Sequence, residues 1–311
     1  MTKGLTTTQG RAPAAGSGQV QDLVQDFIAF VDATDSTIRA YTAGLKQFIA
    51  FLASNEIARP ERQDVIAFRE AIKERGLKAN TIQLYIVSVR RFFQWTEAQG
   101  LYPNIAKGIK GATVNNGFKK DYLTAEQLQL MFDRIDTSTE PGARNKAILA
   151  LMATAGLRTI EVIRADIGSL DGDRLYIHGK GRDEADEYIK LSSHVQALMR
   201  AYLDTYRPGA ADEEALFTST SNNNQGARLT TRSISGIAKQ AYRSIGIDSS
   251  RHTAHSLRHT AATLNLMNGG TIEETQNLLR HSNINTTMIY LHHINRASNQ
   301  SEQRISNAIF A

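Results

Sequence analysis

The 311-residue sequence contains no cysteine, one tryptophan and only five prolines. The absence of cysteine excludes disulfide bonds, thiolate metal sites and cysteine nucleophiles. No apolar run approaches the roughly 18 residues that would indicate a membrane-spanning helix. The opening stretch MTKGLTTTQG lacks the apolar segment of a secretory signal. These absences favour a cytoplasmic protein that does not associate with a membrane.

The composition that is present, 41% hydrophobic and 22% charged, is that of an ordinary globular protein. The length favours two domains over one. The net charge of +5 is unevenly distributed: residues 225–311 hold 9 basic and 4 acidic side chains, whereas residues 111–224 hold 13 and 17. A basic C-terminal third favours a polyanionic partner. The net charge fits a mildly basic enzyme without such a partner equally well.

Residues 20–105 carry four stretches in which apolar residues recur at helical spacing. Ser36 is the expected N-cap of the second stretch. Gly76 and Gly100 close the third and fourth, as glycine commonly does after a helix. The pattern predicts an all-α four-helix domain over 20–105, preceded by a disordered leader over 1–19.

Residues 106–120 contain several glycines and asparagines and keep no regular period, so we expect a linker there. A second domain is predicted over 121–298. It opens with a capping box, Thr124 followed by Gln127. A strongly apolar helix follows and ends at Gly156.

A β-hairpin is predicted next, because two short strand-like runs, Leu175–His178 and Tyr188–Leu191, flank a Gly-Lys-Gly-Arg turn. Thr271 with Glu274 forms a second capping box. Further helices are expected at 193–206, 230–245, 254–268, 271–280 and 286–292. The predicted fold class is therefore mostly α with a small β-hairpin, an all-α N-terminal domain preceding an α+β C-terminal domain.

The stretch HSLRHTAAT places His255 and Arg258 three residues apart at a predicted helix start, so both project from one face. Free N–H groups and the helix dipole make such a start suitable for a phosphate. Each residue also has an ordinary interpretation. Arg258 fits a surface cation, and His255 fits a polar residue with satisfied hydrogen bonds.

The stretch LLRHSNINTTMIY places His281 just past a helix end and Tyr290 nine residues later. A tyrosine flanked by Met288, Ile289 and Leu291 is more commonly a core residue. Tyrosine hydroxyls nevertheless serve as covalent nucleophiles in some enzymes.

Arg158 follows Gly156 by two residues, and Glu161 comes three residues later. A neighbouring carboxylate can hold a guanidinium in place for bidentate phosphate binding. Lys180 occupies the tip of the predicted hairpin, where a solvated turn lysine is the ordinary interpretation.

In this order and spacing, the sequence resembles the tyrosine recombinases, the phage-integrase-type site-specific recombinases, in their simple two-domain, Xer-like form. The resemblance covers residues 122–295, and the N-terminal unit looks like the family's core DNA-binding domain. Arg280 stands where the family usually has glycine, and Ala155 where it usually has threonine. The segments that carry the resemblance are AGLRTIEVIRADI, IHGKGRDEADEYIKL and HSLRHTAATLNLMNGGTIEETQNLLRHSNINTTMIY.

The resemblance implies an enzyme that cuts and rejoins double-stranded DNA through a 3′-phosphotyrosyl intermediate, with strand exchange via a Holliday junction. DNA integration by a mobile element is among the activities it implies. Tyr290 would be the nucleophile and Lys180 the general acid, and Glu161 would orient Arg158. The implied catalytic set is Arg158, Lys180, His255, Arg258, His281 and Tyr290.

No cofactor is expected. His252, His255 and His259 could form a metal cluster, but that site would lack a nearby carboxylate and Arg258 would repel a cation. The sequence holds no G-x-x-x-x-G-K-[ST] phosphate loop, so no dependence on ATP is indicated.

The expected partner is double-stranded DNA with paired inverted-repeat sites, bound by a homo-tetramer. An accessory protein is a further candidate partner. The tail over 299–311 carries Ile305, Ala308, Ile309 and Phe310 at helical spacing, so it packs in cis or is exchanged between protomers. Basic residues are the candidate DNA contacts. They are Arg90, Arg91, Lys107, Lys119, Lys120, Arg228, Arg232, Lys239 and Arg243.

Two other functions fit much of the pattern. A type IB topoisomerase-like enzyme would use the same chemistry on one DNA site without pairing two. A catalytically silent DNA-binding protein would keep the basic surface, but the complete catalytic set argues against it.

Overall fold

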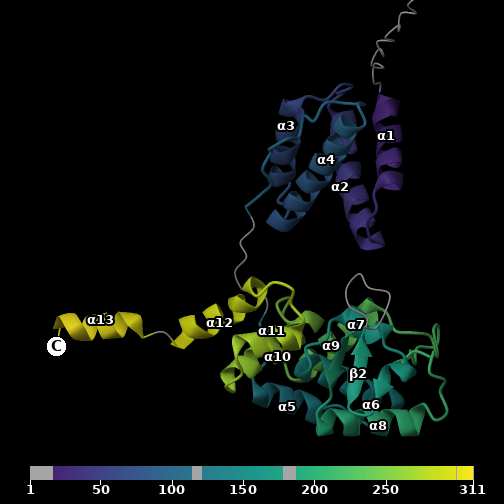
Figure 1. Cartoon of the computed structure of the whole chain (residues 1–311), viewed down its shortest axis with the longest axis vertical. Coiled ribbons are helices and arrows are strands. Elements are labelled where there is room, and N and C mark those ends of the chain that lie inside the picture. The colour runs from purple at the N-terminus through teal and green to yellow at the C-terminus, as the bar shows by residue number, and fades with distance from the viewer. Residues whose placement is uncertain (1–16, 114–120, 178–186, 299, 311) are drawn as a thin grey trace, which may run out of the picture. The chain divides into compact units, whose positions relative to one another are not determined.

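The computed structural model describes residues 17–113, 121–177, 187–298 and 300–310. The chain divides into two compact units, Met1–Asn115 and Asn116–Ala311 (Figure 1). Each unit has its own apolar core.

The first unit consists of four helices, as predicted: α1 (Ser17–Phe30), α2 (Asp35–Ser54), α3 (Arg62–Glu74) and α4 (Ala79–Ala98). Helices α2 and α4 form the main packing pair, and α1 and α3 pack onto them. Aromatic rings fill the interior, with Phe48 in edge-to-face contact with Phe68 at 5.2 Å and with Phe93 at 5.9 Å. The core continues past α4, because Ala106 and Ile109 are buried against it.

The second unit is mostly helical, and α6 (Glu140–Thr154) lies at its centre. Nine residues of α6 are buried, because its sequence is apolar on nearly every face. It packs against α8 and α10. The other helices are α5 (Ala125–Asp133), α7 (Thr159–Arg164), α8 (Ser193–Tyr206), α9 (Thr231–Ser244), α10 (Ala254–Met267), α11 (Ile272–Leu279) and α12 (Asn285–Ser298), with a 3-10 turn at Ile167–Ser169.

A small antiparallel sheet completes this unit, in the order β1 (Leu170–Asp171), β2 (Arg174–Ile177) and β3 (Glu187–Lys190). The β2–β3 register pairs Leu175 with Ile189, and both side chains are buried. The hairpin prediction is confirmed. Lys180 at its predicted tip lies outside the described residues.

The capping predictions had different outcomes. Gln127 N–H donates to the Thr124 hydroxyl at 3.2 Å and Glu274 N–H to that of Thr271 at 3.1 Å, so both capping boxes are confirmed. The Ser36 cap was wrong, because α2 begins at Asp35 with Thr34 as its N-cap. The Thr34 carbonyl already accepts the N–H of residues 37 and 38, so the first turn closes two residues earlier.

The C-terminal helix α13 (Ser301–Phe310) has no buried residue. Its apolar side chains Ile305, Ile309 and Phe310 are 60%, 65% and 83% exposed. Within the described ranges, no helix combines the length and the apolar character that crossing a bilayer requires.

Candidate active site

Arg258 occupies the middle of the site. It projects from α10, is 1% exposed, and donates from Nη1 to the Gly156 carbonyl at 2.5 Å and from Nη2 to the Leu279 carbonyl. The two carbonyls follow or end helices α6 and α11, where the last C=O groups have no partner within the helix. One guanidinium therefore joins three separate segments of the chain.

Gly156 is required where it lies. Its φ of +60° is in the left-handed region, which glycine enters without steric cost. A Cβ atom there would lie 2.8 Å from Cδ2 of Leu279, closer than normal contact. Glycine at this position therefore lets the turn after α6 approach α11 without backbone strain and without displacing the Leu279 side chain.

Arg158 lies at the start of α7 and is held by the buried carboxylate of Glu161. Arg158 Nη1 donates to Oε1 of Glu161 at 2.7 Å, and the Arg158 backbone N–H donates to Oε2 at 2.8 Å. Glu161 also accepts from Nη2 of Arg280 at 2.9 Å. Burial raises the pKa of the Glu161 carboxyl, but the charges and hydrogen bonds of Arg280 and Arg158 outweigh it, so the net pKa is below its ordinary value.

His281 follows α11 and points toward the start of α12. Its Nδ1 lies 2.8 Å from the Thr287 hydroxyl, and its carbonyl accepts from Nε2 of Gln276 at 2.8 Å. Burial, and then the charges of Arg258 and Arg158, lower the pKa of His281 to about 4. The ring is therefore neutral at physiological pH.

Tyr290 lies on α12 and is 4% exposed, packed with Ala262 and Leu279. Burial raises the pKa of its phenol to about 12, and the positive charges of Arg258 and Arg158 oppose that rise. The phenol thus lies within the electrostatic field of both arginines.

Two histidines on α10 form a row of ring contacts that begins at Tyr290. The His259 ring centroid is 5.3 Å from that of Tyr290, and the His255 ring meets His259 edge to face at 4.6 Å. His255 itself is exposed. Within the described residues, no group of three His, Asp or Glu side chains is placed to hold a metal ion.

The structure thus brings five of the six predicted catalytic residues to one region, and Lys180 lies outside the described residues. Three contacts in this region were not assigned from the sequence: His259 between two rings, Thr287 against His281, and Arg280 on Glu161. The only sequence signal for Arg280 was its departure from the glycine usual at that position.

Comparison with known proteins shows to which family the chain belongs. The model of the phage integrase family matches residues 121–296, and that of the phage integrase N-terminal SAM-like domain matches residues 25–100. The chain belongs to the phage integrase family. It is an Xer-like tyrosine recombinase, an enzyme that breaks and rejoins DNA, so the family and activity inferred from the sequence motifs are confirmed.

Curated relatives of this recombinase include tyrosine recombinase XerD of Listeria monocytogenes serotype 4b (strain F2365). That protein is 28% identical over 284 residues, which cover 88% of this chain and 94% of the relative. Tyrosine recombinase XerC of Salmonella typhi is 30% identical over 262 residues, covering 82% and 84%.

Solved structures share the fold of the recombinase. XerH bound to palindromic difH in a post-cleavage complex matches with a TM-score of 0.68 at 22% identity, covering 94% of this chain and 84% of that one. A lambda integrase tetramer bound to a Holliday junction matches with a TM-score of 0.70 at 15% identity, covering 89% and 77%. The predicted fold class is confirmed.

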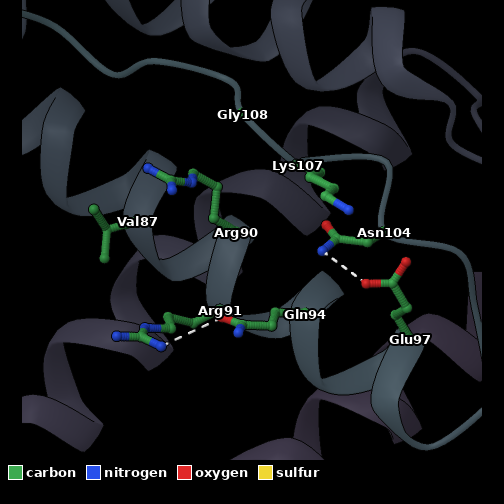
Figure 2. Close-up of a pocket in the computed structure, with 8 residues that line it drawn as sticks. All are labelled: Val87, Arg90, Arg91, Gln94, Glu97, Asn104, Lys107 and Gly108. Atoms are coloured by element: carbon green, nitrogen blue, oxygen red, sulfur yellow. Dashed lines mark hydrogen bonds between the residues drawn. The ribbon is translucent and has the colours of Figure 1, made fainter.

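Three of the candidate DNA contacts line a polar groove of about 550 Å³ on the N-terminal unit of the recombinase. Figure 2 shows Arg90 and Arg91 on α4 and Lys107 on the segment after it, all lining the groove. All three side chains are exposed. Nearby Asn104 is bonded to Glu97 at 3.2 Å, which fixes part of the groove wall.

Other candidate DNA contacts have partners within the chain. Arg228 pairs with Asp166 at 2.5 Å and also donates to two backbone carbonyls, while Lys239 and Arg243 both pair with Asp248. Arg232 is exposed at the start of α9. Lys119 and Lys120 lie outside the described residues.

Proposed function

We propose that this recombinase cleaves DNA with Tyr290 as the nucleophile. The phenolic oxygen bonds to the scissile phosphorus, and the bond from phosphorus to the 5′ oxygen breaks. The products are a 3′-phosphotyrosyl link and a 5′-hydroxyl, and the later reverse attack rejoins a strand. The single observation that carries this proposal is that Tyr290 packs against Ala262, on the helix of Arg258, and against Leu279, whose carbonyl accepts from Arg258.

In this proposal, Arg158 and Arg258 bind the nonbridging oxygens of the phosphate and stabilise the charge that develops on the phosphorane. A preorganised donor of this kind contributes about 3–4 kcal/mol to lowering a barrier. Both guanidinium groups are held by other contacts of the protein, so their orientation is set before DNA binds.

Proton transfer is assigned to His255 and Lys180, and His281 has a hydrogen-bonding role. His255 takes the phenolic proton of Tyr290, and the neighbouring His259 ring keeps His255 on the Tyr290 side of α10. His281 is neutral and hydrogen-bonds a phosphate oxygen. Lys180 protonates the 5′ oxygen as it leaves.

The reaction requires a movement of α12. Tyr290 is 4% exposed and Arg258 is 1% exposed, so a DNA phosphate cannot reach either side chain in this conformation. Displacement of α12 would uncover both groups together, because Tyr290 belongs to α12 and packs on the helix that carries Arg258.

At the level of the assembly, we propose a homo-tetramer on two inverted-repeat sites, with strand exchange through a Holliday junction and room for an accessory protein. The support is the lambda integrase tetramer of shared fold and the exposed apolar residues of α13, which suit docking on a neighbouring protomer. The proposed phosphate contacts are Arg90, Arg91, Lys107 and Arg232. The proposed compartment is the cytoplasm.

The experiment first selects a DNA site that the protein binds from a library of random palindromic duplexes. That site is then synthesised with a nick next to the cleavage position. Cleavage releases the short strand beside the nick, which prevents rejoining and traps the covalent adduct. Wild-type protein should form a covalent adduct that survives denaturing electrophoresis. Tyr290→Phe should form none and bind DNA within about twofold of wild type, because only the nucleophilic oxygen is removed.

Tyr176→Phe, a tyrosine on β2, is the matched control and should form the adduct normally. An adduct that persists in Tyr290→Phe would overturn the assignment of the nucleophile. Wild-type binding without any adduct would favour the silent DNA-binding protein, and nicking-closing without exchange between paired sites would favour the topoisomerase-like enzyme.

A further inference from the structure

Arg280 adopts an unusual backbone conformation for its residue type. It ends α11 with φ 52° and ψ 49°, in the left-handed region. Among the described non-glycine residues, only Glu56 shares a positive φ. Because a Cβ atom is crowded in this conformation, an arginine here costs free energy that a glycine would not.

The Arg280 side chain is also buried, with 9% of it exposed. Its Nε has no hydrogen-bond partner among the described residues, and an unpartnered buried donor is a second unfavourable contribution. Neither feature stabilises the fold. The contacts made by the other two guanidinium nitrogens must therefore account for what this residue does.

Those contacts reach the supports of both proposed phosphate-binding arginines. Nη2 donates to Oε2 of Glu161 at 2.9 Å, and Oε1 of the same carboxylate holds Arg158. Nη1 donates to the Leu278 carbonyl at 2.7 Å, next to the Leu279 carbonyl that accepts from Arg258.

Two longer bonds complete the arrangement. Arg280 donates at 3.4 Å to the carbonyls of Ala155 and Gly156, and Arg258 donates to that same Gly156 oxygen. Arg280 therefore ties the turn after α6 to the end of α11 and to the first residues of α7. These are the segments that fix the positions of Arg158 and Arg258.

The positive charge of Arg280 also favours cleavage of the phosphodiester. Within the described residues of this cluster, Glu161 pairs with Arg158 and Arg280, and Arg258 is bound only to backbone carbonyls, so positive charge is in excess. Attack on a phosphodiester adds negative charge to the phosphate. An additional buried cation favours that transition state over the ground state, because low surrounding polarity strengthens the interaction.

We propose that Arg280 is a positioning residue of the recombinase, which orients Arg158 through Glu161 and Arg258 through the Gly156 carbonyl that both arginines bind and the Leu278 carbonyl at the end of α11, and adds positive charge behind the scissile phosphate. This inference rests on the proposed function, because it assigns Arg158 and Arg258 to the phosphate.

The test compares Arg280→Gly and Arg280→Lys with wild type on the nicked duplex described above. The glycine variant accepts the left-handed backbone without strain, and Arg158 still compensates the Glu161 charge, so the variant should fold, with a melting temperature close to that of wild type. Its rate constant for adduct formation at saturating DNA should fall about 10- to 100-fold, because the phosphate-binding groups lose their orientation. DNA affinity should stay within about twofold.

Arg280→Lys keeps the charge but not the planar fork, so its cleavage rate should lie between those of Arg280→Gly and wild type. Glu56→Gly is the matched control, because it makes the same backbone exchange at the other positive-φ site, in the N-terminal unit. It should cleave at the wild-type rate.

A second readout follows the pKa of His281 by NMR titration. Burial and the charges of Arg258, Arg158, His255 and Arg280 hold this pKa at about 4. In Arg280→Gly the pKa should rise, since one of these charges is removed, whereas in Arg280→Lys it should stay near the wild-type value.

Cleavage by Arg280→Gly within twofold of wild type would overturn the inference while leaving the proposed function intact. So would a loss of cleavage that merely follows a loss of folded protein. Absence of an adduct with the wild-type protein would overturn the proposed function and this inference with it.

Discussion

At the scale of single residues, the site depends on how one carboxylate and a few carbonyl groups hold several cations together. Glu161 is 1% exposed and its two oxygens bind Arg158 and Arg280. A buried carboxylate is stable only when its charge is compensated. Removal of Arg158 or Arg280 therefore leaves Glu161 undercompensated and changes how it binds the remaining arginine. The site is therefore a unit, and effects of substitutions in it should not be additive.

His281 provides a prediction about pH. Its pKa is lowered from the ordinary 6.5 to about 4, so the unfolded chain binds more protons than the folded one between these values. The contribution of His281 to the free energy of unfolding is fully present above about pH 6.5 and is lost as the pH falls toward 4. Because the ring is only half-buried, we expect a loss of about 1 kcal/mol.

Denaturant unfolding at a series of pH values measures this effect. His281→Asn should show a shallower decline of stability between pH 6.5 and 4 than wild type, since the amide can bond Thr287 but does not titrate. His194→Asn, at an exposed position on α8, should keep the wild-type slope. An unchanged slope in His281→Asn would contradict the prediction.

At the scale of elements, the site is assembled where helices end. Arg158 begins α7, Arg280 ends α11, and the carbonyls that hold Arg258 follow α6 and end α11. Unpaired groups at helix ends are available for such contacts, whereas groups inside a helix are already bonded. The close approach of two helix ends at Gly156 makes this possible.

Gly156→Ala should therefore be costly. A left-handed alanine and the overlap with Leu279 should together lower the free energy of unfolding by about 2–4 kcal/mol, measured by denaturant titration. Cleavage should also fall, because the Gly156 carbonyl holds Arg258.

Two alanine substitutions separate the causes. Gly172 has φ +59° with no atom near the added methyl, so Gly172→Ala reports the backbone cost alone. Gly236 lies in α9 without a positive φ and with open space, so Gly236→Ala should slightly stabilise the protein. A loss in Gly156→Ala no larger than that in Gly172→Ala would show that the contact with Leu279 is unimportant.

At the scale of the whole molecule, the two units have separate apolar cores, and α13 contributes to neither. The apolar side chains of α13 remain exposed in the single chain, which favours burial in an assembly rather than in the monomer. The tail should therefore affect assembly more than folding.

Ile309→Asp tests this division. Thermal stability of the free protein should change by less than about 0.5 kcal/mol, because Ile309 is 65% exposed. Assembly on paired DNA sites, measured by native gel and light scattering, should weaken at least tenfold. Asn307→Asp adds the same charge on the same helix and should assemble normally. A clear loss of monomer stability in Ile309→Asp would instead indicate packing in cis.

The sequence by itself determined the elements and the order of the catalytic residues. Helical periodicity, capping boxes and the hairpin turn are local patterns, so the four N-terminal helices, the caps at Thr124 and Thr271 and the β2–β3 pair could be predicted. The cap of α2 was misplaced by two residues, since Thr34 and Ser36 are both good caps and only the local hydrogen bonds choose between them.

Only the tertiary structure decided how the residues of the site support one another. Arg280 and Glu161 are 119 residues apart, and Arg258 and Gly156 are 102 apart, so no local pattern could pair them. The same holds for the burial of Tyr290 and for the pairing of Arg228 with Asp166. A side chain's charge and hydrogen-bonding capacity are set by its covalent structure, but its partners are set by which segments the folded cores bring together.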